Sequence, residues 1–433
     1  MPDDWKEEYR SKFISADEAG QMVKSGDTVV FTMGREAFAI GMAIAARKEE
    51  LKNVTIIAPH PGYDFGWYDE GWEDSFNIKI AMPTATCQEA VDAKRCNLIP
   101  LPIASGLIKA PDLVLTEISP PDEKGFCSFG QSLWNKKNQI REGQLVIAEV
   151  NNNLIRTYGD NFIHFSEIDY FVEHISSGTG FAKGSLAGRV NKEPEPYLRD
   201  IAGYVSTLIR DGDTIQIGVG RTTEPLVRLG MLDQKHDLGI HSEATPPGVI
   251  TLVRKGIING SRKTINKGKV TVTSLGGGSK EEMEWASNNP LFELVDSDYL
   301  EDISVIAAND NMVAINNALV IQLDGQISAE SLGRRLLSAA GGQTAFVVGA
   351  LMSKGGRSIT VLPSLSRKTS RIVSTFEPGT VVTIPRNLAD YVVTEYGIAH
   401  LLGKSLKERA QEMIAVAHPD FRSDLKKEAA KLF

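Results

Sequence analysis

A glutamate that follows a short strand pattern is the residue of this chain best placed to do chemistry. Residues 238–241 read as a strand, Glu243 lies two residues further on, and Pro246-Pro247-Gly248 makes a turn that cannot extend a strand. We therefore expect Glu243 at the edge of a sheet, where open α/β folds bind their ligands. A carboxylate there can act as a nucleophile. An ordinary loop carboxylate explains this segment alone equally well.

Two glycine turns could bring backbone N–H groups to a ligand. Gly218-Val219-Gly220 lies between a strand pattern and a helix pattern, but no third glycine follows, so a dinucleotide-binding loop is not predicted. Gly341-Gly342-Gln343 precedes an apolar run. Adjacent glycines let backbone amides approach a ligand closely enough to stabilise an oxyanion. A simple turn is the alternative for this second motif.

Two polar positions are further candidates. Asn316 interrupts an apolar strand pattern, and a buried amide must find hydrogen-bond partners. A structural amide at a strand edge is the alternative. Lys354 lies in a basic, glycine-containing turn that could hold a phosphate group, and a solvated turn is the alternative there.

The elements that must position these residues occur twice in the chain. Residues 25–35 and 211–221 share a Gly-Asp-Thr turn and a later Gly-Arg pair at one constant offset, and residues 168–173 resemble residues 389–395. Each copy of the first pair runs from a helix pattern through a strand to a second glycine turn, which is the order of a parallel α/β unit. The repeat predicts two related open α/β domains that arose by tandem duplication, at residues 1–190 and 191–433. A polar, proline-rich linker is expected near residues 188–196.

Apolar and amphipathic runs predict the individual elements. We expect helices at 16–24, 197–210, 406–417 and 424–433. Buried strands are expected at 54–58, 113–117, 145–150, 270–274, 304–308 and 345–348.

Composition excludes several classes of protein and site. The chain has 433 residues and a formal net charge of -8, which disfavours nucleic acid and anionic membranes as partners. The acidic N-terminus has no apolar signal segment, and no apolar run reaches the ~18 residues of a membrane helix, so we expect a cytoplasmic protein. The three cysteines lack a C-x-x-C spacing and predict buried thiols, and the histidines form no metal-binding pattern.

Several motifs in order along the chain resemble the acetyl-CoA hydrolase/transferase family, whose class I CoA-transferases include 4-hydroxybutyrate and butyrate CoA-transferases. The resemblance rests on the segment that ends in Glu243, on Gly341-Gly342-Gln343 and on the stretch 391–397 around Glu395, and it extends through residues 119–127 and 417–421. It implies a CoA-transferase-like fold in both domains. The chain departs from the family in the segment after the glutamate and beyond Gln343, where related enzymes commonly have an aspartate.

The resemblance also implies roles for the candidates. Glu243 would be a nucleophile that carries first an acyl group and then CoA, and Asn316 would orient it. Glu395 would be a second carboxylate near the active centre, with interior pairing as its alternative role. Backbone amides at Val219, Gly220, Gly341 and Gly342 would form the oxyanion site, Gln343 would lie near the thioester, and Lys354 would contact CoA.

The expected function is therefore a CoA-transferase that moves CoA from a short-chain acyl-CoA to a carboxylic acid by a ping-pong mechanism through a glutamyl-CoA thioester. An acyl-CoA hydrolase that uses the same glutamate is the nearer alternative, and a non-catalytic ligand-binding member of the fold is the more distant one. Coenzyme A enters as a substrate thioester, and no metal or redox cofactor is expected. The family implies a homodimer. The residues do not indicate which acid is bound.

Overall fold

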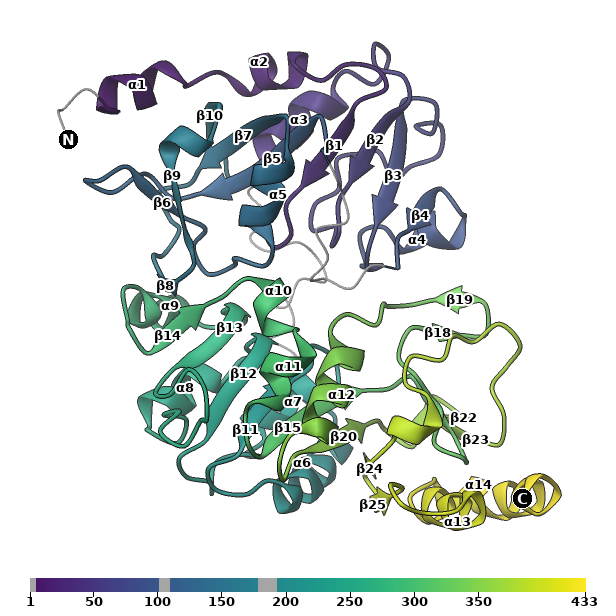
Figure 1. Cartoon of the computed structure of the whole chain (residues 1–433). Helices are drawn as coiled ribbons and strands as arrows, with labels where there is room; N and C mark the ends of the chain where they lie inside the picture. The colour runs from purple at the N-terminus through teal and green to yellow at the C-terminus, as the bar shows by residue number, and fades with distance from the viewer. Residues whose placement is uncertain (1–4, 101–109, 178–192) are drawn as a thin grey trace. The chain divides into compact units, whose positions relative to one another are not determined.

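The structure, a computed structural model, describes residues 5–100, 110–177 and 193–433 (Figure 1). Its contacts form two compact units, Met1–Arg189 with Ser279–Asp298, and Val190–Gly278 with Tyr299–Phe433. The first unit thus includes a segment from the second half of the chain. The expected linker lies largely outside the described residues, and the bounds 1–190 and 191–433 stay a prediction.

The first unit is built on a parallel sheet (Figure 1). Its strands follow the order β10-β7-β5-β1-β2-β3-β4. Their runs of Val, Ile and Leu are typical of strands that are buried on both faces. The bounds are β1 Thr28–Phe31, β2 Val54–Ile57, β3 Phe76–Ile80, β4 Cys96–Leu98, β5 Leu113–Ile118, β7 Leu145–Val150 and β10 Tyr170–Glu173.

Short helices and a small antiparallel pair complete the first unit. Helix α2 contacts α3 and β10, and α5 contacts β5. Ser15 and Glu18 form a capping box that fixes the start of α2. The bounds are α1 Trp5–Ser11, α2 Ala16–Gln21, α3 Phe38–Ala45, α4 Gln88–Asp92, α5 Lys136–Glu142, η1 Phe165–Glu167, α9 Lys280–Ala286, β6 Phe126–Ser128, β8 Tyr158–Gly159, β9 Phe162–His164 and β14 Phe292–Leu294.

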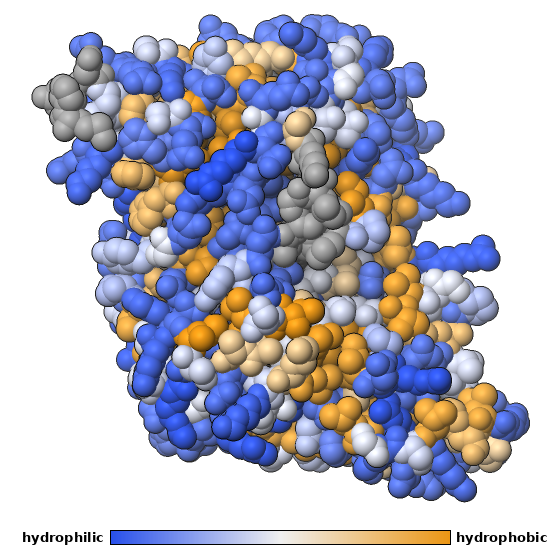
Figure 2. Space-filling model, viewed as in Figure 1, coloured by the Kyte–Doolittle hydropathy of each residue, from blue (hydrophilic) through white to orange (hydrophobic). Residues whose placement is uncertain are grey.

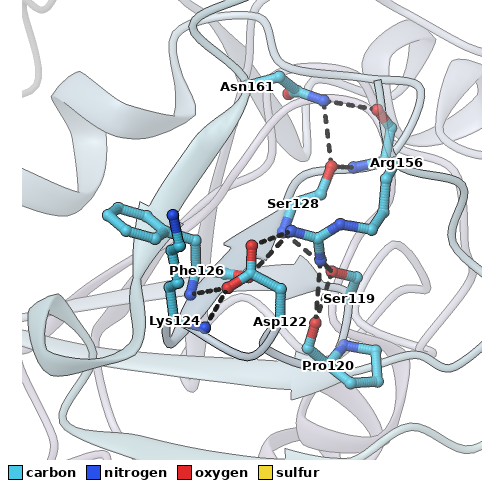
Figure 3. A network of polar contacts seen from close by, with 9 residues as sticks. Ser119, Pro120, Asp122, Lys124, Phe126, Ser128, Arg156 and Asn161 are labelled. Carbon is cyan, nitrogen blue, oxygen red and sulfur yellow. Dashed lines mark hydrogen bonds and ion pairs between the residues drawn. The ribbon is translucent and has the colours of Figure 1, made fainter. Parts of the chain in front are cut away.

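Arg156 holds the loop that begins at the end of β5 (Figure 3). Its guanidinium donates to Ser119 Oγ at 3.1 Å and to Phe126 O at 3.0 Å, and it forms an ion pair with Asp122 at 3.2 Å. The other Asp122 carboxyl oxygen accepts the Phe126 N–H at 3.0 Å. These bonds satisfy the polar groups of a tight loop, so we assign this network a structural role.

The second unit has a sheet of the same kind. Strands β24, β20, β15, β11, β12 and β13 are neighbours in that order and pair in parallel, and β25 pairs antiparallel with β24. The bounds are β11 Thr214–Ile217, β12 Gly239–Ala244, β13 Val270–Ser274, β15 Met312–Asn317, β20 Arg357–Val361, β24 Tyr391–Thr394 and β25 Gly397–His400.

The two sheets have the same strand order, as a tandem duplication requires. Strands 10-7-5-1-2-3 of the first unit correspond one by one to strands 24-20-15-11-12-13 of the second. Repeated aspartates also make the same bonds. Asp27 and Asp213 each accept the N–H three residues earlier, at 2.8 and 2.6 Å. Asp169 and Asp390 each accept the N–H of the second residue of a neighbouring strand, at 2.8 and 3.0 Å.

Helices cover both faces of the second sheet. Right-handed crossovers put α7, which joins β11 to β12, and α12, which joins β15 to β20, on opposite faces. Apolar side chains gather on the visible surface over α11 and α12 (Figure 2), where Ile303 and Met352 are exposed. The bounds are α6 Tyr197–Leu208, α7 Thr223–Arg228, α8 Val249–Arg254, α10 Ser297–Leu300, α11 Ile303–Ala307, α12 Gln343–Met352, α13 Leu406–Ala415 and α14 Pro419–Leu432.

Short strands and one 3-10 turn lie between α11 and α13. They are β16 Val320–Gln322, β17 Ile327–Ser328, β18 Ser331–Leu332, β19 Arg335–Leu336, β21 Leu365–Ser366, β22 Thr369–Ser370, β23 Ile372–Val373 and η3 Arg386–Leu388. None of the helices in the described ranges is long and apolar enough to cross a membrane.

Two expected strands are helices, so these predictions are wrong. Residues 304–308 fall in α11, which starts because the Asp302 side chain caps the Ser304 N–H. Residues 345–348 fall in α12, which follows the Gly341-Gly342 turn. Short apolar runs do not show a period that separates a strand from a buried helix.

Candidate active site

The carboxyl ends of β11, β12 and β15 meet where the strand order reverses direction. From β11 the chain adds β12 and β13 on one side and then β15, β20 and β24 on the other. Open α/β sheets bind ligands at such a reversal, because the loops from the two sides diverge there. The residues at these strand ends are Glu243 from β12, the Gly218-Val219-Gly220 turn after β11, and Asn316 and Asn317 from β15.

Glu243 is held by its strand and by the turn that follows. The Thr273 hydroxyl on β13 donates to Glu243 O at 2.7 Å, and the neighbours of Glu243 on β12 are in register with β13. Gly248 then adopts a φ of 98° directly before α8, which suits a glycine. Glu243 is partly exposed, yet its Oε1 atom is buried and has no hydrogen-bond partner among the described residues.

The Gly341-Gly342 turn brings the start of α12 against the Glu243 carboxyl. Gly341 has a φ of 53°, and Gly342 is the residue directly before α12. A methyl group placed on Gly342 would lie 3.1 Å from both Cδ and Oε1 of Glu243. The close approach therefore depends on the missing side chain. The Gln343 amide donates to Asn317 O at 3.3 Å and ties this turn to β15.

A second carboxyl, that of Glu301, lies at the same place. The same methyl position on Gly342 would be 3.1 Å from Glu301 Cδ. Glu301 follows α10 and is buried. His241 Nε2 donates to Leu300 O at 2.8 Å, so β12 anchors the backbone next to Glu301. The sequence contained no signal for Glu301, since its segment has neither a motif nor a period and the contact is purely tertiary.

Burial changes the proton affinity of these groups. Loss of hydration raises the pKa of Glu243, while hydrogen bonding with the Glu301 side chain and the Gly342 backbone opposes the rise. Burial lowers the pKa of His241 to about 3, with a smaller contribution from Lys263. His241 is therefore neutral at pH 7 and carries its proton on Nε2.

The strand-end amides pair with each other and with the α7 turn. Asn316 and Gln216 exchange two hydrogen bonds, at 3.0 and 3.1 Å. Asn317 Oδ1 accepts the N–H groups of Thr222 and Thr223, at 3.3 and 3.1 Å, and so caps the start of α7. Sequence reasoning missed Gln216 and assigned no role to Asn317. Asn316 lies beside the expected site, and its hydrogen bonds in this structure go to Gln216.

The glycine turn after β11 is close to the same strand ends. Val219 is exposed, and its carbonyl accepts from Asn317 Nδ2 at 3.1 Å. The Gly220 N–H donates to Glu224 Oε1 at 2.9 Å, so this amide has a protein partner in this structure.

Glu395 and Lys354 lie at other places on the second sheet than Glu243. Glu395 follows β24 and accepts the Ser364 N–H at 2.9 Å and the Ser364 hydroxyl at 2.5 Å. It thus has the interior pairing that was its alternative role. Lys354 lies in the exposed turn before β20. The amino ends of parallel strands lie at the opposite edge of the sheet from the carboxyl ends, so Lys354 and Glu243 occupy opposite edges. Roles for both residues in catalysis or CoA binding stay predictions.

Family models and curated relatives match this chain over most of its length. The acetyl-CoA hydrolase/transferase C-terminal domain model matches residues 278–429, and the N-terminal domain model matches residues 104–181. The chain is 37% identical to the 4-hydroxybutyrate coenzyme A transferase of Clostridium kluyveri, over 99% of this chain and 100% of that protein. It is 31% identical to the butyryl-CoA:acetate CoA-transferase of Anaerostipes caccae, over 99% and 98%.

Solved structures resemble the whole chain. The 4-hydroxybutyrate CoA-transferase of Porphyromonas gingivalis has a TM-score of 0.80 at 32% identity and covers 99% of this chain and 100% of its own. RipA from Yersinia pestis has a TM-score of 0.87 at 29% identity, with 98% of each chain covered. With matches to both domain models and full-length relatives above 30% identity, the chain belongs to the acetyl-CoA hydrolase/transferase family.

Proposed function

We propose that this protein is an acyl-CoA:carboxylate CoA-transferase that works through a covalent thioester on Glu243. The observation that carries the proposal is the position of the Glu243 carboxyl, at a strand end and against the side-chain-free Gly342. The full-length relatives named as CoA-transferases support the reaction class. Acyl-CoA and a small carboxylic acid are the substrates.

The proposed reaction proceeds by double displacement. A Glu243 carboxylate oxygen attacks the thioester carbonyl, the C–S bond breaks, and CoA leaves as a thiolate, which gives an acyl-glutamyl anhydride. The thiolate then attacks the Glu243 carbonyl carbon and releases the first acid, so Glu243 becomes a CoA thioester. The second acid repeats these steps in reverse order. Water is never the acceptor, so the thioester energy is kept.

Other residues have supporting roles in this proposal. The Gly341 and Gly342 amides stabilise oxyanions, because backbone N–H groups at the start of a helix favour negative charge. Asn316 helps to orient the site through its paired amide. Burial favours the neutral form of Glu243, whereas the attack needs the carboxylate. The proposal therefore requires that Glu243 is ionised when the substrate is bound. We expect a homodimer from the family resemblance and a cytoplasmic protein from the sequence.

Glu243 is tested by substitution and mass analysis. We expect Glu243→Gln to lower acyl exchange by more than ~1000-fold, because the amide cannot form the thioester. After incubation with acyl-CoA, the wild-type peptide that contains Glu243 should gain the mass of CoA less one water, and borohydride should convert the adduct to an alcohol. The Glu428→Gln variant in α14 serves as the control. Full activity of Glu243→Gln with no adduct on the wild type would exclude the proposal.

Dependence of the rate on an added carboxylic acid distinguishes a transferase from a hydrolase. The acid that is used best identifies the second substrate. Thioester loss should be nearly absent without an added acid and should rise with acetate, butyrate, 4-hydroxybutyrate or succinate. Equal rates with and without an acid would instead identify an acyl-CoA hydrolase. A panel of these acids with one acyl-CoA ranks the acceptors by kcat/KM.

A further inference from the structure

The carboxyls of Glu243 and Glu301 share one small space. Both Cδ atoms lie 3.1 Å from the position that a methyl group on Gly342 would take. Hydrogen bonding with the Glu301 side chain lowers the pKa of Glu243. Glu301 is buried, and the Oε1 atom of Glu243 is buried as well.

Two carboxylates in contact inside a protein hold a proton between them, because two adjacent negative charges repel. The flanking elements do not offset this repulsion, since β11, β13, β15 and α12 carry no ionisable side chain and α10 carries no basic one. One member of the pair is therefore a carboxylic acid, which has an O–H to donate.

The remaining titratable groups near the pair have other roles. His241, on β12, is neutral and donates to Leu300 O. Lys263 donates to Ile240 O at 2.8 Å and to Thr271 Oγ1 at 2.7 Å. Glu224, on α7, accepts the Gly220 N–H.

We propose that Glu301 is a further catalytic residue of the transfer: as a carboxylic acid, it donates a hydrogen bond to the Glu243 carboxyl and stabilises the oxyanion that forms there. This inference rests on the proposed function, because the oxyanion arises only when Glu243 itself is attacked. The Gly342 N–H is the second donor in this proposal, in line with its lowering of the Glu243 pKa.

The step balances without a net proton transfer. When an acceptor carboxylate attacks the Glu243 thioester, a C–O bond forms and the carbonyl electron pair moves onto the glutamyl oxygen. The Glu301 O–H and the Gly342 N–H then face a full negative charge. The C–S bond breaks, the carbonyl re-forms, and CoA leaves as a thiolate. Glu301 keeps its proton throughout.

Discharge of the covalent intermediate tests this role. Wild type, Glu301→Gln, Glu301→Ala and the control Glu428→Gln are loaded with acetyl-CoA, freed of excess ligand and mixed with butyrate. The loss of the CoA adduct is followed by intact mass. The glutamine amide retains an N–H donor, so this variant should discharge within about threefold of wild type. The alanine variant should discharge ~100-fold more slowly, as for loss of one oxyanion donor.

The pH profile distinguishes a proton donor from a structural group. Discharge by wild type should fall at alkaline pH when Glu301 loses its proton, whereas Glu301→Gln should show no alkaline fall because its donor does not titrate. Melting temperatures identify any variant that does not fold, and the glutamine variant alone then decides the question.

Failure of the inference differs from failure of the proposed function. If wild type gains no CoA on the Glu243 peptide, the proposed function itself fails. If the adduct forms but the glutamine variant keeps the wild-type alkaline fall, or is as slow as the alanine variant, Glu301 is not the donor and this inference is overturned.

Discussion

Gly342 is the residue whose lack of a side chain allows two carboxyls to meet at the start of α12. Its φ of -75° is accessible to any residue, so the constraint at this position is space and not backbone conformation. A methyl group there would lie 3.1 Å from Glu243 Oε1, which is closer than an ordinary van der Waals contact. A substitution at Gly342 should therefore change the active site without changing the fold.

Gly342→Ala should reduce kcat by at least ~10-fold, because the methyl group displaces the Glu243 carboxyl by a few tenths of an ångström, and small misplacements of a nucleophile are costly. The melting temperature should change by no more than a few degrees. Steady-state kinetics and thermal unfolding measure the two effects. A large loss of stability would contradict this prediction, because it would show that the methyl group mainly disrupts the Gly341-Gly342 turn and not the Glu243 carboxyl.

The matched control is Gly203→Ala. Gly203 lies within α6, and a methyl group there would meet no atom within 4 Å. This variant should keep full activity and gain up to about 1 kcal/mol in the free energy of unfolding, because alanine favours helix.

Residue-level prediction relied on what the sequence encodes locally. Glu243 is predicted because a strand pattern ends beside it and a proline turn follows. Glu301 was not found, since only the packed chain brings the end of α10 to the end of β12. The expected second carboxyl, Glu395, has its hydrogen bonds with Ser364.

At the scale of elements, one buried histidine joins β12 to the backbone after α10. His241 Nε2 donates to Leu300 O, and its Nδ1 atom has no hydrogen-bond partner in the described ranges. Protonation of Nδ1 would therefore place a charge in the interior with no acceptor for its proton. The bond that joins β12 to the backbone after α10 is therefore sensitive to acid.

Acid should weaken the fold through His241. Burial lowers the pKa of His241 to about 3 in the folded state, while the unfolded chain binds the proton near pH 6.5. The stabilisation is therefore complete above pH 6.5 and is lost as the pH falls toward 3. Between pH 7 and 5 the loss should be about 2 kcal/mol in urea unfolding.

His241→Gln should remove this part of the pH dependence, because the amide can still donate to Leu300 O but does not titrate. The exposed residue His236 provides the control, and His236→Gln should keep the wild-type slope. Equal slopes in all three proteins would contradict the assignment.

Strand prediction was accurate where the pattern is long and the flanking turns are clear. Residues 145–150 and 270–274 are strands with the predicted bounds. Residues 345–348 show the limit, because a run of four apolar residues fits a buried strand and a buried helix equally well. The glycine pair before it predicts an oxyanion site or a simple turn, and in the structure it precedes a helix.

At the scale of the whole molecule, the chain returns to the first unit after only three strands of the second sheet, β11, β12 and β13. Within residues 279–298, β14 pairs with β8, and Leu294 O accepts the Asp160 N–H at 2.8 Å. Gly159 permits this approach. A methyl group on it would lie 2.1 Å from Leu294 O, and its φ is 100°.

Gly159→Ala should destabilise the protein because it blocks the β8–β14 pair. Gly71 is the control, since its φ of 86° imposes a similar backbone cost while a methyl group there would meet no atom within 4 Å. Gly159→Ala should cost roughly 1–3 kcal/mol more than Gly71→Ala in urea unfolding, from overpacking alone. Equal costs would mean that backbone conformation accounts for the whole effect.

The duplicated architecture was predictable from the sequence, whereas the returning segment was not. Repeated Gly-Asp-Thr and Asp-Tyr motifs mark equivalent turns, and their aspartates make equivalent bonds. Residues 279–298 contain no copy of either motif. Their place in the first unit depends on pairing with distant residues, which a local pattern does not encode.

The returning segment also affects the order in which parts of the protein can fold during synthesis on the ribosome. The main sheet of the first unit is complete once residue 173 has emerged, but β8 cannot find its neighbour until residue 294 is made. By then β11, β12 and β13 have left the ribosome too. Domains usually mature one after the other from the N-terminus. In this protein the first unit cannot form its β8–β14 pair until residue 294 has been made, and by then the nascent chain already contains Glu243.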